Sequence, residues 1–298
     1  MRRMTRVGLL GVALGVTVLA ACAPQQQASP AATGAGAAST AASADAALGP
    51  CSPENLTTVE SGKLTIGTDS PAYPPYFEDE DPTNGKGFES AVAYAVAKGL
   101  GIKPADVIWV VVPFNSSYAP GEKAFDFDIN QISITPERAG VVDFSDGYYT
   151  VNQAVVALDK SPIANATSVG DLKNAKLGAQ VGTTSLEFIT QVIQPTSEVQ
   201  VFNDTNDAKN AMQNGQIDGI VVDLPTAYYI TAVEIPNGKI VGQFAAQEGG
   251  EQFGMLFQKG NPLVSCVNGV LEQLKSSGEL QKIQDTWLAG ASAPYFKE

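Results

Sequence analysis

The stretch NQISITPERAG, residues 130 to 140, marks the point where a strand ends and a turn begins. It overlaps the apolar run FDINQISI (127–134), which is typical of a strand. Pro136 has no amide proton for a central sheet hydrogen bond, so the strand must end before it. The turn then places Ser133 and Arg138 at the end of the strand.

On both sides of this stretch, short apolar runs alternate with helical patterns. The sequence predicts strands at 63–68, 107–112, 127–134, 151–158 and 217–222, and helices at 87–101, 183–194 and 261–278. Such alternation indicates an α/β fold with mainly parallel sheets. From Cys51 onward the chain has 248 residues, close to the size at which one core divides into two.

Arg138 stands out because the chain otherwise uses lysine. The other arginines are Arg2, Arg3 and Arg6, all at the extreme N-terminus, against fourteen lysines. Arginine offers a planar fork of donors that matches a carboxylate, whereas lysine is a flexible point charge. We therefore predict that Arg138 binds an acidic group. A surface arginine in a helical turn is the alternative.

Two further features suit the charged groups of a small ligand. GTTS (182–185) opens a helix after a strand, where free amide groups and the hydroxyls of Thr183 and Thr184 favour an anion. Asp223 follows the apolar run 217–222, at the strand end where α/β sheets bind ligands. The alternatives are an ordinary helix cap at GTTS and a capping role for Asp223.

The loop GTDSPAYPPYFE (67–78) is the third candidate part of a site. Its prolines stiffen the chain, and Tyr73 would flank a ligand side chain, although core or rim positions suit its aromatics equally well. Asp69 would meet a cationic group. The following acidic run, 78–85, lacks the residue spacing of a calcium loop, so no metal is predicted.

The N-terminus has the pattern of an exported lipoprotein. Basic residues precede an apolar run at 7–20, which is too short to span a membrane and suits a secretory signal covering residues 1–21. It ends in LAAC, which resembles a lipobox with Cys22 as the lipidated residue; an ordinary signal is the alternative. Residues 22–50 are rich in alanine, serine and glutamine and predict a disordered tether.

Charge and composition exclude several classes of function. The formal net charge of −13 becomes −16 without residues 1–21, which argues against a nucleic-acid partner. The chain has no histidine, so Ser-His-Asp and Cys-His catalysis are excluded and a zinc site is disfavoured. We predict no catalytic residues and no cofactor.

With Cys22 lipidated, Cys51 and Cys266 remain as an even pair in an exported protein. An oxidising compartment favours a disulfide between them, tying the start of the folded region to a late helix. Two unpaired thiols are the alternative.

Several motifs occur together in a familiar order. They are LTIGTDSPAYPPYFE, GFE at a helix start, ISITPERAGVVDFSDGYY, VGTTS, IDGIVVDLPTA and GNPLVSCVNGVLEQLKSSGELQKIQDTW. Over about residues 60 to 290 the chain resembles the family 3 extracellular solute-binding proteins of ATP-driven amino-acid importers.

This resemblance implies a two-lobed fold of the type II periplasmic binding proteins, with two crossover strands as the hinge and the ligand between the lobes. The expected boundaries are 51–152 for the first part of lobe 1, 153–247 for lobe 2 and 248–298 for the return to lobe 1.

The resemblance also assigns roles to residues. Arg138 would pair with the ligand α-carboxylate, assisted by Ser133, Thr183 and Thr184. Asp223 would hold the α-amino group, and Tyr73 would cover the side chain. The chain departs from the family pattern at Pro120-Gly121, Ala91, Asn130 and Gln131, so side-chain specificity does not carry over.

The resulting interpretation is a non-catalytic, monomeric lipoprotein at the extracytoplasmic face of the membrane. It would bind an amino acid or close analogue and deliver it to a membrane permease with its ATPase subunits. One alternative is a dehydratase-like enzyme of the same fold, with acids such as Asp143 and Asp146. The other is a ligand sensor without a transport role.

Overall fold

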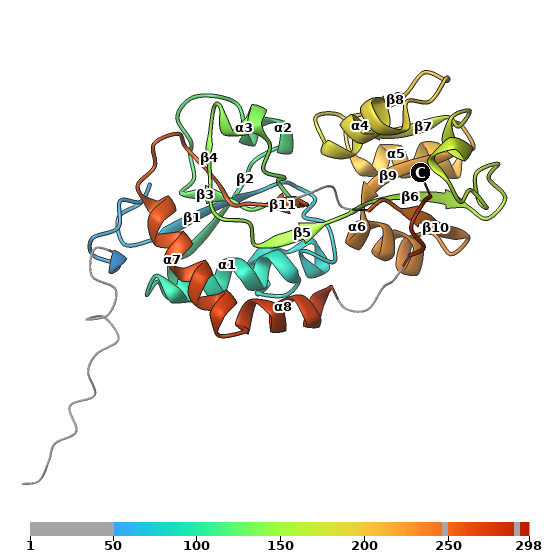
Figure 1. Cartoon of the computed structure of the whole chain (residues 1–298). Coiled ribbons are helices and arrows are strands. Elements are labelled where there is room, and N and C mark those ends of the chain that lie inside the picture. The colour runs from blue at the N-terminus through green and yellow to red at the C-terminus, as the bar shows by residue number, and fades with distance from the viewer. Residues whose placement is uncertain (1–50, 246–249, 289–292, 298) are drawn as a thin grey trace, which may run out of the picture. The chain divides into compact units, whose positions relative to one another are not determined.

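The computed structural model describes residues 51–245, 250–288 and 293–297. In this part of the chain the strands form two five-stranded sheets and a two-stranded sheet (Figure 1). The expected signal and tether, including Cys22, lie outside the described residues. No described helix is long and apolar enough to cross a membrane.

The first lobe is built on a sheet with the order β2-β1-β3-β12-β4. Its strands are β1 (Leu64–Thr68), β2 (Val107–Val111), β3 (Phe127–Asp128), β4 (Asp143–Phe144) and β12 (Leu256–Phe257), and its helices are α1 (Phe88–Gly99), α2 (Phe114–Ser117), α3 (Pro136–Ala139), α7 (Leu263–Ser276) and α8 (Glu279–Trp287). The apolar faces of α1 and α7 pack against Ile66 and Phe127 in the largest core cluster. Residues of α7 such as Val267 and Leu271 lie on the apolar face of the helix predicted at 261–278 and form part of this core.

The second lobe has a sheet with the order β10-β6-β9-β7-β8. Its strands are β6 (Gln153–Leu158), β7 (Leu177–Gln180), β8 (Gln200–Phe202), β9 (Gly219–Asp223) and β10 (Gly238–Gln243), and its α-helices are α4 (Thr184–Phe188), α5 (Thr205–Gln213) and α6 (Leu224–Tyr229). The π-helices Ile189–Ile193 and Ile230–Glu234 follow α4 and α6 directly. Alternate residues of β6 enter different cores: Val155 packs in one cluster and Val156 in another. This two-residue period explains why the strand is apolar from residue 154 to residue 158.

Two strands carry the chain between the lobes. β5 (Tyr149–Val151) and β11 (Glu251–Phe253) pair antiparallel, β5 leading into the second sheet and β11 returning to the first. The two-lobed fold with two crossover strands, which the family resemblance implied, is therefore present. The single strand predicted at 151–158 is divided, because β5 pairs with β11 whereas β6 belongs to the second sheet.

The sheets are less parallel than the alternation of strands and helices predicted. In the first sheet β12 runs antiparallel to β3 and β4, and in the second sheet β6 runs antiparallel to β9 and β10. β6 and β12 each follow a crossover strand, so they enter their sheets against the direction of the neighbouring strands.

The end of the chain also differs from the expected boundaries. Tyr295 forms a bridge with Gln243, and Phe296 packs against Phe244 with ring centroids 4.8 Å apart. Residues 293–297 therefore pack on the second lobe, although 248–298 had been assigned to the first.

The predicted disulfide between Cys51 and Cys266 is confirmed. It ties the start of the described chain to α7, and the two cysteines are 215 residues apart in sequence. Because a cross-link over so long a loop restricts the unfolded chain strongly, it is expected to stabilise the fold.

We predict that Cys51→Ser combined with Cys266→Ser lowers the free energy of unfolding by about 3–5 kcal/mol. Urea denaturation of wild type and double variant measures the difference. Dithiothreitol should destabilise the wild type and leave the variant unchanged; equal stabilities in non-reducing buffer would refute the prediction.

A buried acid supports an unusual turn near β3. Gln131 has a left-handed backbone with φ of 49°, which is strained for a residue other than glycine. Glu89 of α1 compensates by accepting bonds from the Gln131 amide at 2.7 Å, from its side-chain nitrogen and from the Tyr148 hydroxyl. Burial raises the pKa of Glu89 to about 7, although these donors oppose the shift.

This raised pKa predicts a dependence of stability on pH. In the unfolded chain Glu89 loses its proton near pH 4.5, but in the folded chain only near pH 7. Its contribution is therefore complete below pH 4.5 and decreases as the pH rises to 7, by up to about 3 kcal/mol.

Glu89→Gln keeps the shape of the side chain and removes the titration. Between pH 4.5 and 7 its free energy of unfolding should fall less steeply than that of wild type, as measured by urea denaturation. Parallel pH profiles for the two proteins would contradict the assignment.

Candidate ligand-binding site

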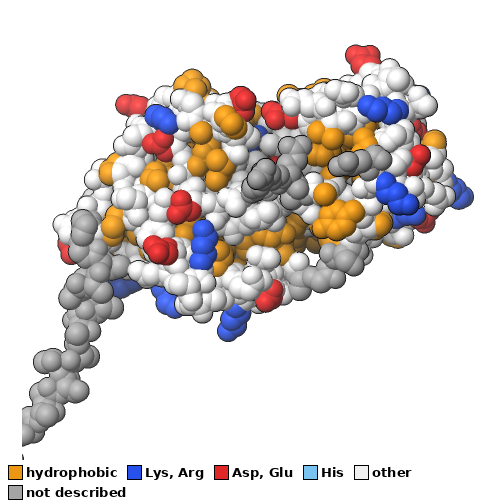
Figure 2. Space-filling model, in the orientation of Figure 1, with side chains coloured by type: hydrophobic (Ala, Val, Ile, Leu, Met, Phe, Trp, Pro, Cys, Tyr) orange, Lys and Arg blue, Asp and Glu red, His pale blue; other side chains and the backbone are white. Residues whose placement is uncertain are grey.

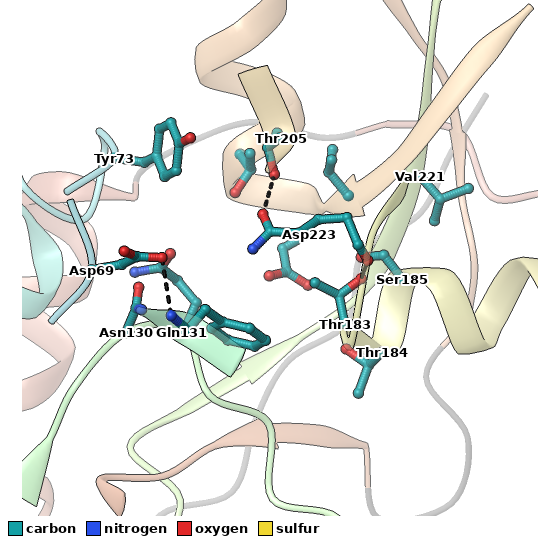
Figure 3. Close-up of a pocket in the computed structure, with 14 residues that line it drawn as sticks. Asp69, Tyr73, Asn130, Gln131, Thr183, Thr184, Ser185, Thr205, Val221 and Asp223 are labelled. Atoms are coloured by element: carbon teal, nitrogen blue, oxygen red, sulfur yellow. Dashed lines mark hydrogen bonds between the residues drawn. The ribbon is translucent and has the colours of Figure 1, made fainter. Parts of the chain in front are cut away.

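Side chains of both lobes line a cavity beside the crossover strands (Figure 3). The first lobe contributes Asp69, Tyr73, Phe114, Asn130 and Gln131, and the second contributes Gln180, Thr183, Thr184, Ser185, Thr205, Val221, Val222, Asp223 and Thr226. In Figure 3, Asp69, Tyr73 and Asn130 lie on one side of the cavity, and Asp223 and the threonines lie on the other.

The first-lobe wall offers polar groups that are not fully bonded. Asp69 follows β1 and accepts a bond from the Phe114 amide at 3.1 Å. Within the described ranges, the Tyr73 hydroxyl and the Asn130 side-chain nitrogen are buried without a hydrogen-bond partner. Burial of such groups is costly unless a partner is supplied, so this wall is suited to a polar ligand.

The two threonines of the GTTS turn have different roles. Thr183 caps α4: its hydroxyl accepts a bond from the Leu186 amide at 3.2 Å and donates to the Gln180 carbonyl at 2.8 Å. The Thr183 side chain therefore forms an ordinary helix cap, which was the alternative to anion binding in the sequence analysis. Thr184 instead donates to Glu251 at 2.6 Å.

Asp223 ends β9 and begins α6, but its carboxylate does not cap that helix. It accepts a bond from the Gln153 side-chain nitrogen at 2.7 Å. Burial, and next the negative charge of Glu251, raise the pKa of Asp223 well above its usual range. A cationic group placed in the cavity beside it would favour the charged carboxylate.

Arg138 lies in α3 and is buried, with 7% of its surface exposed. Its guanidinium donates to the Ser133 carbonyl at 2.7 Å and to the Gly182 carbonyl of the other lobe at 2.9 Å. It also lies over the Tyr118 ring, 4.9 Å from the centroid. Burial lowers the pKa of Arg138, but arginine keeps its charge in proteins.

The lobes approach closely at Gly182. Its φ is 73°, and a Cβ atom there would lie 2.3 Å from the Tyr118 hydroxyl and 2.4 Å from the Asn115 side-chain oxygen. Glycine is therefore required both for the left-handed turn and for the contact that brings Arg138 to its carbonyl.

The cavity brings together five of the seven ligand-binding candidates: Asp69, Tyr73, Thr183, Thr184 and Asp223. Ser133 and Arg138 lie next to it instead of on its surface. The Ser133 hydroxyl is 3.4 Å from that of Thr184, and Arg138 bonds the residue before Thr183. The described residues contain no group of three or more His, Cys, Asp or Glu side chains suited to a metal.

Sequence reasoning missed Gln153 and Glu251. Gln153 bonds Asp223, Glu251 at 3.0 Å and Ser185 at 2.7 Å. The available signal was a buried polar residue inside the apolar run 151–158. No sequence pattern indicated Glu251, because its contacts depend on how β11 pairs with β5.

The family model for bacterial extracellular solute-binding proteins, family 3, matches residues 64–290. The chain belongs to this family. The resemblance inferred from the sequence motifs is thereby confirmed.

Several known proteins are similar to this chain over most of their own length. The L-cystine-binding protein TcyJ of Escherichia coli (strain K12) is 29% identical over 234 residues, which cover 76% of this chain and 83% of the relative. An ancestral arginine-binding protein bound to arginine is 32% identical, with a TM-score of 0.65, covering 76% of this chain and 98% of that one. The substrate-binding protein of an amino acid ABC transporter is 30% identical, with a TM-score of 0.62, covering 75% and 98%.

We predict that Asp223→Asn lowers amino-acid affinity by about tenfold to a hundredfold, because a charged hydrogen bond to the ligand ammonium is lost. Isothermal titration calorimetry measures the effect. Asp207→Asn makes the same charge change at an exposed position of α5 and is the matched control. Equal affinities of the two variants would exclude Asp223 from the site.

Proposed function

We propose that this protein binds an amino acid or close analogue between its lobes and delivers it to a membrane permease driven by ATPase subunits. The observation that carries the proposal is the cavity lined by side chains of both lobes, with Asp223 in its wall and Arg138 directly behind it. Family membership supports it, as do the relatives named for binding cystine and arginine.

A free amino acid carries one positive and one negative group, and the proposed site has a complement for each. Asp223 would accept the α-ammonium group. Arg138, which uses two of its five N–H groups on the Ser133 and Gly182 carbonyls, would bind the α-carboxylate with others. The hydroxyls of Ser133 and Thr184 lie close enough together to assist.

The ligand side chain would extend toward Asp69, Tyr73 and Asn130. Asp69 suits a cationic group, and the unpartnered groups of Tyr73 and Asn130 suit polar atoms. We therefore propose a basic or polar amino acid. The named relatives bind different amino acids, so their ligands do not identify which basic or polar amino acid this chain binds.

We further propose a monomer that is held by lipid on Cys22 at the extracytoplasmic face of the membrane, with residues 22–50 as its tether. The disulfide supports an oxidising compartment. On the face shown in Figure 2, the described lysines are scattered among acidic side chains, so this face has no basic stripe for nucleic acid.

The acids considered for the enzymatic alternative, Asp143 and Asp146, lie outside the cavity lining. Asp143 pairs with Lys259 at 2.8 Å and accepts a bond from the Gly260 amide. Turnover in a product assay, instead of stoichiometric binding, would nevertheless identify an enzyme. A ligand sensor would bind equally well but would not support uptake into cells.

Calorimetry with each of the standard L-amino acids and L-cystine tests the proposal. We expect saturable binding of at least one basic or polar member with one site per chain. Absence of binding across the set would contradict the proposed function.

We predict that Arg138→Lys weakens this binding by at least about a hundredfold, because lysine cannot replace the planar fork that bonds a carboxylate. Calorimetry gives the affinity, and circular dichroism spectra verify that the variant is folded. Wild-type affinity in a folded variant would overturn the assignment of Arg138.

A further inference from the structure

Glu251 connects both lobes next to the cavity, through hydrogen bonds with Ser133 of the first lobe and Thr184 of the second. It lies in the crossover strand β11, outside both five-stranded sheets. One of its carboxylate oxygens accepts bonds from the Ser133 hydroxyl at 2.5 Å and the Thr184 hydroxyl at 2.6 Å. The other accepts a bond from the Gln153 side-chain nitrogen at 3.0 Å.

Ser133 and Thr184 are the two hydroxyls assigned to the ligand carboxylate, and each has only one proton to donate. In the structure both protons are directed at the same oxygen of Glu251. A ligand carboxylate can only accept hydrogen bonds, so it cannot receive these protons while Glu251 holds them.

We propose that Glu251 is a built-in competitor for the carboxylate subsite. Its side-chain carboxylate occupies the donors of Ser133 and Thr184, and an incoming amino acid must displace it to bond them. Glu251 therefore weakens binding and limits it to ligands whose carboxylate replaces its own. This inference rests on the proposed function.

Electrostatics lead to the same conclusion. A ligand carboxylate bonded to these hydroxyls would lie beside the Glu251 charge, and like charges this close repel in a partly buried site. The Glu251 charge also raises the pKa of Asp223, which would attract the ligand ammonium, but the two carboxylates share only the Gln153 side chain as a hydrogen-bond partner. The direct contacts with the hydroxyls make repulsion of the carboxylate the larger effect.

Two substitutions separate the contributions. Glu251→Gln keeps the size and one acceptor oxygen but removes the charge, whereas Glu251→Ala frees both hydroxyls. Glu187→Gln is the matched control, because Glu187 and Glu251 both line a groove that also contains Thr184, and Glu187 is exposed. Neither hydroxyl donates to it; both donate to Glu251.

The full-length protein and the three variants are titrated with each standard L-amino acid and L-cystine by calorimetry. We expect the dissociation constant for the bound amino acid to fall roughly tenfold in Glu251→Ala and by a smaller factor in Glu251→Gln. Glu187→Gln should match wild type.

The outcomes distinguish this inference from the proposed function. If wild type binds and the folded Glu251 variants bind equally or more weakly, Glu251 is not a competitor, although the proposed function stands. An equal gain in Glu187→Gln would also overturn the inference, because it would show a general charge effect. If no protein binds any amino acid, both proposals fail.

Discussion

Glu251 lies opposite Val151 in the antiparallel pair of β5 and β11, and Gln153 follows two residues later on the outgoing chain. This pairing positions a carboxylate and an amide side by side where the two lobes meet. From there Gln153 reaches Asp223 and Ser185 in the second lobe, while Glu251 reaches Ser133 in the first. The polar part of the site thus depends on the crossover strands keeping their register. A shift by one residue would turn Glu251 to the opposite face.

Buried acids are a second common feature of the molecule. Burial raises the pKa of Glu89, Asp128 and Asp223, and only Glu89 is surrounded by several hydrogen-bond donors. Asp128 has no hydrogen-bond partner for either oxygen in the described part of the chain. Retaining such groups costs stability. At Asp223 the cost has a use, since a cationic ligand would supply the missing charge.

Much of the fold could be predicted because its signals are local. Short apolar runs identified β1, β2 and β9, and a helical pattern identified α7. The direction of β6 and β12 was not predictable in this way, because it depends on the crossover strands β5 and β11 that lead into them. The strand predicted at 127–134 ends at Asp128, and the left-handed turn that follows at Gln131 is bonded to Glu89 of a distant helix.

In the candidate site, too, some residues could be found from local sequence patterns and others could not. Residues in motifs, such as Arg138 and Asp223, were found from their place at strand ends and from the family resemblance. Gln153 and Glu251 are 98 residues apart in sequence, and Ser133 is 118 residues from Glu251. No local pattern connects them. Thr183 and Thr184 are adjacent and chemically alike, yet only the folded chain separates the helix cap from the residue that faces Glu251.

The central claim is that one small molecule satisfies opposite charges contributed by the two lobes. A crystal structure of the protein with its amino acid bound tests this most directly. The account places a nitrogen of Arg138 within hydrogen-bond distance of the ligand carboxylate, about 2.7–3.2 Å, and Asp223 at similar distance from the ammonium group. A bound amino acid whose carboxylate lies elsewhere, with Arg138 still bonded only to the Ser133 and Gly182 carbonyls, would contradict it.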